Sequence, residues 1–159
     1  MNFHNPPARN HTLYDESFTQ HPDMAEQTVL TAVRTWLRPQ CDSVRRNSDW
    51  SGVLHEAGMT ANGIGYFDIL MRSLMRASCR PLDTRCRCAS ELANDEASLL
   101  QIIALLQRTR SDAATQMLNN WLPQPTVSTV LKIMRWFSIA LLDAGLVLQV
   151  RARRVTYMH

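Results

Sequence analysis

The sequence predicts an all-α protein: a compact single-domain bundle of about six helices, with a disordered N-terminal arm and a short β-leaning C-terminal tail. Apolar residues recur at helical spacing in several separate segments, and prolines lie between those segments. A chain of 159 residues is also long enough to bury roughly two thirds of its unfolded surface around one core. We therefore expect a flexible arm at 1–22, a helical bundle domain at 23–145 and an extended basic tail at 146–159.

The arm is polar and shows no apolar periodicity. Its histidines, His4, His11 and His21, stand at irregular spacing, which is typical of solvated loop histidines rather than of a metal site. The arm lacks the apolar core of a secretory signal, and no later stretch is long and apolar enough to span a bilayer. The four cysteines are too few for a disulfide scaffold, so we expect a bacterial, cytoplasmic protein with reduced or metal-bound thiols.

The first two helices are predicted from their ends. Asp23 is placed to cap a helix, Glu26 follows three residues later as in a capping box, and Pro39 stops the helix. A short helix at 50–57 comes next and ends at Gly58, in the role that glycine usually has after a helix.

The third helix has one of the clearest amphipathic patterns in the chain. Thr60 can cap its N-terminus, and Pro81 interrupts the chain beyond its end. Its apolar stripe comprises Ile64, Phe67, Leu70, Met71, Leu74 and Met75.

The fourth helix is predicted to form the buried centre of the bundle. It begins at Ser90 or Asn94, and its first turn carries Asp95 and Glu96, where carboxylates complement the positive end of the helix dipole. Its interior is apolar on nearly every side: Leu99, Leu100, Ile102, Ile103, Leu105 and Leu106.

Two further helices complete the bundle. Ser111 is expected to cap the fifth, and Pro123 and Pro125 to end it. The sixth covers about 127–144 and closes at Gly145, after which the valine-rich chain favours an extended conformation.

The tryptophans allow two interpretations. Trp36, Trp50, Trp121 and Trp136 lie on or near apolar helix faces, so packing in the core is the default expectation. A partly exposed subset would instead anchor a partner, because tryptophan and arginine dominate interface hot spots.

Three of the four cysteines lie within ten residues, in the segment after the third helix. Cys79, Cys86 and Cys88 could hold zinc with Cys41 or His55 as the fourth ligand, although their spacing lacks the paired knuckles of structural zinc sites. A redox role is also open, because neighbouring arginines favour the reactive thiolate. Free thiols that pack as small apolar side chains are the simplest interpretation.

Positive charge gathers in two segments, the Cys-rich connector and the C-terminal tail. Either could meet an anionic partner, although solvated surface arginines are the common case. The candidate anion- or partner-binding residues are Arg80, Arg85, Arg87, Arg151, Arg153 and Arg154.

The stretch from Val53 to Thr60, followed by Ile64 and Phe67, resembles the DNA-binding helix–turn–helix pattern. A small residue and a glycine form the turn, and apolar residues follow at the spacing of a second packed helix. Before Arg72, however, the second helix presents none of the basic side chains that groove readers use. The pattern therefore favours an ordinary helical hairpin.

The chain carries no zincin, dinucleotide-binding, P-loop or serine-hydrolase motif. We expect a non-enzymatic interaction or adaptor protein without a cofactor, binding an anionic or protein ligand through the Arg-rich Cys loop. The alternative is a cysteine-based metal-binding or redox-sensing protein, and the second alternative is a helix–turn–helix nucleic-acid binder. An unidentified protein is the expected partner, nucleic acid and membrane are not expected, and a homodimer stays open.

Overall fold

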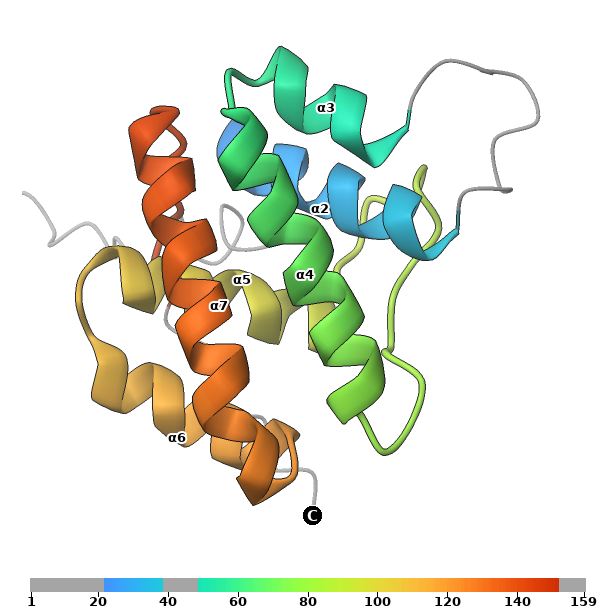
Figure 1. Cartoon of the computed structure of the whole chain (residues 1–159). Coiled ribbons are helices and arrows are strands. Elements are labelled where there is room, and N and C mark those ends of the chain that lie inside the picture. The colour runs from blue at the N-terminus through green and yellow to red at the C-terminus, as the bar shows by residue number, and fades with distance from the viewer. Residues whose placement is uncertain (1–21, 39–48, 152–159) are drawn as a thin grey trace, which may run out of the picture.

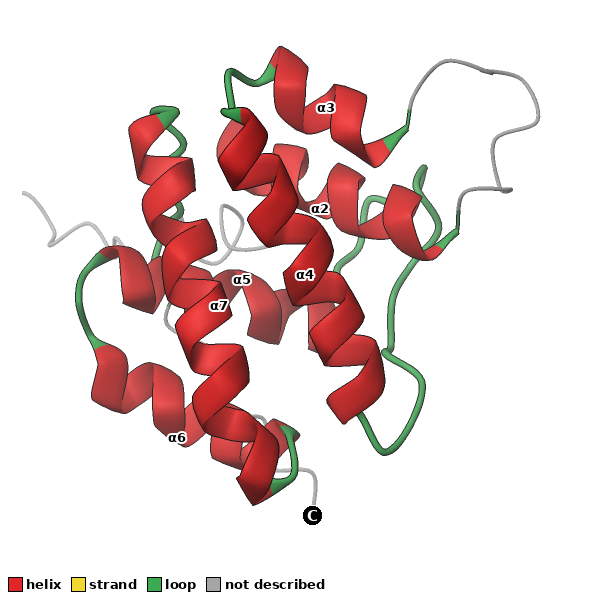
Figure 2. Cartoon of the chain, in the orientation of Figure 1, coloured by secondary structure: helices red, strands yellow, loops and turns green. Residues whose placement is uncertain are grey.

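The structure, a computed structural model, describes residues 22–38 and 49–151, and within these ranges it contains helices and no strand (Figure 2). The all-α prediction is confirmed. The helices are α2 (Met24–Leu37), α3 (Trp50–Glu56), α4 (Ala61–Ala77), α5 (Asn94–Gln107), α6 (Ser111–Trp121) and α7 (Gln124–Asp143). None of them is both long and apolar enough to cross a membrane.

The centre of the bundle is the pair α4 and α7, which lie side by side along most of their length (Figure 1). Phe67 of α4 and Phe137 of α7 are fully buried, with ring centroids 5.4 Å apart, and Trp50 of α3 packs against Phe67 at 5.5 Å. Helix α5 packs against both α6 and α7, and α3 packs against α2. The predicted buried character of α5 is confirmed, because all of its leucine and isoleucine side chains are in the core.

The N-caps predicted for α2 and α4 are present, and Asp49 caps α3 in the same way. The side chains of Asp23, Asp49 and Thr60 each accept a hydrogen bond from the backbone N–H three residues later, at 2.9, 2.6 and 3.2 Å. Gly58 has a φ of +94°, so it supplies the left-handed conformation that turns the chain from α3 into α4.

Three local predictions are corrected. Ser111 is the first residue of α6 rather than its cap. Helix α7 begins at Gln124, before the predicted start, because Pro125 fits the first turn of a helix, where its missing N–H is not needed. Met75, expected in the buried stripe of α4, is 46% exposed.

The segment after α7 packs along α5. The side-chain amide of Gln107 donates to the carbonyl of Leu146 and accepts from the N–H of Leu148, both at 2.8 Å. The N–H of Arg151 donates to Oε1 of Gln101 at 3.1 Å, and Leu148 is fully buried. This part of the predicted tail is therefore attached to the bundle, whereas the arm up to residue 21 and the tail from 152 lie outside the described ranges.

Candidate functional site

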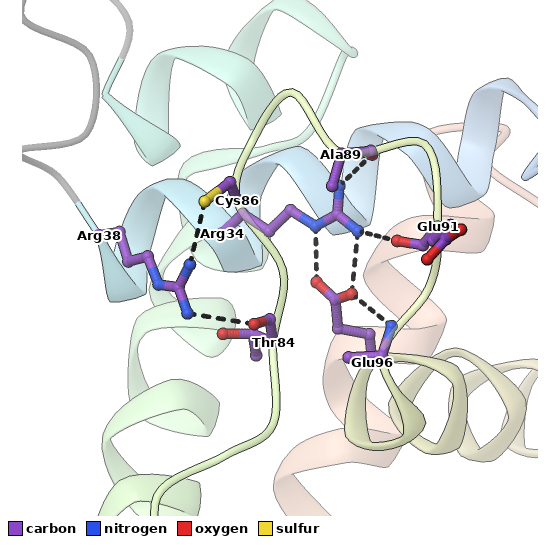
Figure 3. A network of polar contacts seen from close by, with 8 residues as sticks. Arg34, Arg38, Thr84, Cys86, Ala89, Glu91 and Glu96 are labelled. Atoms are coloured by element: carbon purple, nitrogen blue, oxygen red, sulfur yellow. Dashed lines mark hydrogen bonds and ion pairs between the residues drawn. The ribbon is translucent and has the colours of Figure 1, made fainter.

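The Cys-rich connector between α4 and α5 is fixed by an arginine of α2. Arg34 donates to the two carboxylate oxygens of Glu96, from Nε at 2.6 Å and from Nη2 at 2.9 Å. It also donates to the backbone carbonyls of Ala89 and Glu91, both at 2.9 Å (Figure 3). One guanidinium thus joins α2, the end of the connector and the first turn of α5.

The Arg34–Glu96 pair is buried. The Glu96 side chain is inaccessible to solvent, and its carboxylate also accepts the N–H of Ala93 at 2.9 Å, which caps α5. Two charges taken out of water require complete hydrogen bonding, and removal of one partner leaves the other uncompensated. The pair therefore fixes the C-terminal end of the connector at the start of α5.

A second arginine of α2 contacts the middle of the connector. Arg38 donates to Sγ of Cys86 at 3.5 Å and to the carbonyl of Thr84 at 3.1 Å (Figure 3). Beyond Cys86 the chain makes a turn, closed by a 2.9 Å hydrogen bond from the N–H of Ala89 to the carbonyl of Cys86, with Cys88 inside the turn.

The start of the connector is attached to α5 by another ion pair. Arg80 donates to the two oxygens of Asp95 at 2.8 and 3.0 Å, and the N–H of Asp83 donates to the same carboxylate at 2.6 Å. Burial opposes ionisation of Asp95, but the hydrogen bonds from Arg80, Asp83 and Trp121 outweigh it and hold the pKa of Asp95 below its ordinary value.

A third ion pair holds the C-terminal segment against α2. Arg151 donates from Nη2 to Oε1 of Glu26 at 2.6 Å, and the Glu26 side chain is 2% exposed. Burial raises the pKa of Glu26, and the hydrogen bond from Arg151 offsets only part of that effect.

The cysteines of the connector are exposed. Cys79, Cys86 and Cys88 are free thiols on the surface, and Cys41 lies outside the described ranges. Among the residues that the structure describes, no three His, Cys, Asp or Glu side chains are gathered so that they could hold a metal ion. The zinc prediction thus gains no support and stays a prediction.

The predicted anion-binding arginines separate into different groups. Arg80 and Arg151 are paired with carboxylates of the same chain, whereas Arg85 is exposed and makes no such contact. Arg153 and Arg154 are not among the described residues. Asp95 and Glu96, expected only to complement the dipole of α5, also form ion pairs. Glu96 pairs with the buried Arg34, and Asp95 pairs with Arg80, whose side chain is 61% exposed.

The helix–turn–helix pattern is present only as connectivity. The turn at Gly58 joins α3 to α4 as the resemblance implies, but α4 is a core helix packed along α7. At its N-terminal end, a Cβ atom on Gly63 would stand 3.0 Å from the Cβ of Ala140. This face of α4 is therefore packed closely against α7, and the nucleic-acid alternative stays a prediction.

A surface hollow of about 490 Å³ lies where α2, α3 and α4 meet. We name it the tryptophan hollow, and its lining consists of Trp36, Trp50, Asp68, Arg72, Met75 and Arg76. It is widely open to solvent, so it is a surface depression rather than an enclosed ligand cavity. Both tryptophans are half-buried, pack against the core and line the hollow.

The polar groups of the tryptophan hollow are arranged around one carboxylate. Asp68 accepts the indole N–H of Trp36 at 3.0 Å and pairs with Nε of Arg72 at 3.0 Å. Arg76, one turn further along α4, makes no ion pair with a described residue. The indole N–H of Trp50 donates no hydrogen bond to a described residue. The hollow therefore combines apolar walls with donors that have no acceptor in the fold.

A different apolar area lies on the outer side of α4 and α7. Ile69 and Ile139 are each 49% exposed, and Trp136 is 44% exposed. Tyr66 and Lys132 cover part of the Trp136 ring, at centroid distances of 5.6 and 5.1 Å.

Comparison of the chain with models of protein families, with curated proteins and with solved structures found no match.

Proposed function

We propose that the protein is a non-enzymatic interaction module that binds a segment of a protein partner in the tryptophan hollow. The observation that carries the proposal is the union of two tryptophan rings and the exposed thioether of Met75 in one concave surface. Aromatic side chains supply large contact area at interface centres, and methionine adapts its shape to varied partners.

The Cys-rich connector, proposed from the sequence as the binding element, fits this function less well. Arg80 is committed to Asp95, and the ends of the connector are tied to α5 and α2. These contacts support a structural role, in which the connector fixes α2 relative to α4 and α5 and so helps to shape the neighbouring hollow.

The test is selection of binders from a random peptide library displayed on phage. Peptides that occupy the hollow should lose binding to the Met75→Asp variant, because a carboxylate would stand among the apolar walls. Met24→Asp is the matched control, since Met24 is 81% exposed and outside the hollow. Selected peptides that bind both variants and the unmodified protein equally would refute the proposal.

A thiol sensor is the second candidate, favoured by one contact. Arg38 meets the exposed Cys86 at 3.5 Å, and Cys88 follows in the same turn. Oxidation by a peroxide should modify these thiols before it affects the buried core. If Cys86 and Cys88 react with peroxide no faster than a free cysteine in solution, this candidate is removed.

A further inference from the structure

We infer that the segment bound in the tryptophan hollow is acidic: an apolar anchor flanked by aspartate or glutamate side chains. This inference rests on the proposed function and adds the chemistry of the partner. It follows from the polar groups of the hollow, in which hydrogen-bond donors outnumber acceptors.

The hollow has one acceptor side chain, and the fold already uses it. Asp68 receives Trp36 on one oxygen and Arg72 on the other, both at 3.0 Å. Its negative charge is thus compensated within the hollow, and its oxygens are poor sites for a donor from a partner.

The remaining polar groups of the hollow are donors. Arg76 is exposed and makes no hydrogen bond or ion pair through its side chain with a described residue, and the indole N–H of Trp50 donates to no described residue. The Arg72 side chain is 63% exposed and directs only its Nε to Asp68. Two arginines against one aspartate leave a net charge of +1, so a partner with carboxylates would satisfy both hydrogen bonding and charge.

The apolar walls indicate a peptide rather than a nucleic acid. Met75 lies one residue before Arg76, and both line the same hollow as the two tryptophans, so an apolar anchor would be held beside a cation. Nucleic-acid binding normally uses several phosphate contacts, whereas the hollow has one net positive charge and an aspartate against Trp36.

The experiment uses short synthetic peptides that share leucine and phenylalanine anchors and carry Glu, Gln or Lys at the flanking positions. Binding to the full chain is followed by NMR of the indole N–H signals of Trp36 and Trp50. The Glu peptide should bind about fivefold to tenfold more tightly than the Gln peptide, and the advantage should shrink in high salt. The Lys peptide should bind most weakly.

Charge reversal identifies the responsible side chain. Arg76→Glu should invert the preference between the Glu and Lys peptides, and it should fold normally because Arg76 is an exposed surface residue. Arg85→Glu is the control, since it removes the same charge from the exposed Cys-rich connector without touching the hollow. A loss of Glu-peptide affinity of the same size in both variants would overturn the inference.

The outcomes distinguish this inference from the proposed function. Equal binding of the Glu, Gln and Lys peptides at the two indole signals would overturn the acidic partner and leave the interaction site in place. Tighter binding of a single-stranded oligonucleotide than of the Glu peptide would also overturn it. If none of the peptides shifts the indole signals, the inference is wrong, and the library selection with Met75→Asp decides the proposed function separately.

Discussion

Substitution of Arg34 by methionine is expected to be among the most destabilising single changes that conserve side-chain volume. Arg34 makes two hydrogen bonds to Glu96 and two to backbone carbonyls of the connector, and its side chain is 6% exposed. Methionine fills a similar space but makes none of these bonds. The Glu96 carboxylate would remain completely buried, with only the N–H of Ala93 to compensate its charge.

The expected cost is about 3–5 kcal/mol, the range observed when one partner of a buried ion pair is removed. A domain of ordinary stability has about 5–15 kcal/mol in total, so the loss would be roughly a fifth or more of it. For a chain of 159 residues each 1 kcal/mol lowers the Tm by about 2–4 °C, which predicts a decrease on the order of 10 °C.

The assay is urea unfolding followed by far-UV circular dichroism, with Arg72→Met as the matched control. Arg72 forms an exposed ion pair with Asp68 one turn away on the same helix, and such pairs contribute about 0.3–0.5 kcal/mol. The double variant Arg34→Met/Glu96→Leu should be more stable than Arg34→Met alone, because it removes the unpaired charge. Trypsin should also cleave the connector of Arg34→Met faster, since that connector loses two of its attachments.

The reasoning is refuted if Arg34→Met and Arg72→Met lower the free energy of unfolding by the same amount, or if the double variant is no more stable than Arg34→Met. Either result would mean that the buried pair makes no specific contribution and that the connector is fixed by its other contacts.

Other changes test separate parts of the structure by the same unfolding assay. The pKa of Asp95 in the folded protein lies below its ordinary value of 3.8, so its contribution to stability is present above pH 3.8 and is lost as the pH falls through the folded pKa. Asp95→Asn should therefore lose less stability in acid than the unmodified protein does. A pH profile of stability that is the same in both proteins would contradict this. Gly65→Ala should stabilise α4 by about 0.5–1 kcal/mol, because a Cβ there meets no atom within 4 Å. Gly63→Ala should destabilise the protein, because the added Cβ would stand 2.8 Å from Cε of Met59 and 3.0 Å from Cβ of Ala140. If Gly63→Ala stabilised the protein as Gly65→Ala does, the described packing of α4 on α7 would be refuted. Leu148→Ala should lower the free energy of unfolding by about 2 kcal/mol or more, because Leu148 is fully buried. Val147→Ala should lower it by less than about 0.5 kcal/mol, because Val147 is 50% exposed. Equal losses in the two variants would show that this segment does not pack on α5.

The helices could be predicted because their signals are local. A cap such as Asp23 or Thr60 acts on a backbone N–H three residues away, and an apolar stripe repeats within each turn, so both are visible in a short window of sequence. Predictions failed where two local signals competed, as at Pro125, which can end one helix or begin the next.

The contacts that fix the connector and the C-terminal segment could not be predicted in this way. Arg34 and Glu96 are 62 residues apart, and Glu26 and Arg151 are 125 residues apart. Nothing in the local sequence of Glu96 distinguishes a buried partner of arginine from a carboxylate that complements a helix dipole. Only the folded arrangement of α2 and α5 decides between these roles.

The tryptophan hollow shows the same dependence on tertiary structure. The sequence left open whether Trp36 and Trp50 lie in the core or at an interface, and the structure places each at the edge of the core, where it lines the tryptophan hollow. Their rings come from α2 and α3, and Met75 comes from α4, so no single helix contains the pattern. Amphipathic periodicity wrongly placed Met75 in the buried stripe of α4. The error arises because periodicity does not show where a neighbouring helix stops covering that stripe.

Arginine position along the chain is consequently a poor guide to which charges can meet a partner. Arg80 and Arg151, both in positively charged segments, neutralise carboxylates that the fold has partly or fully removed from water. Arg76 belongs to the edge of the same Cys-rich positive segment, yet it projects from α4 beside Met75 and borders the tryptophan hollow. A charge is available for recognition when the fold has not already assigned it an acceptor. Among the described arginines that line the hollow or that the sequence proposes as anion-binding, Arg76 and Arg85 meet this criterion. Of these two, only Arg76 lies beside the apolar side chains of the hollow. If the affinity of an acidic peptide falls on substitution of Arg76 but not of Arg85, binding requires a positive charge and an apolar surface at the same place.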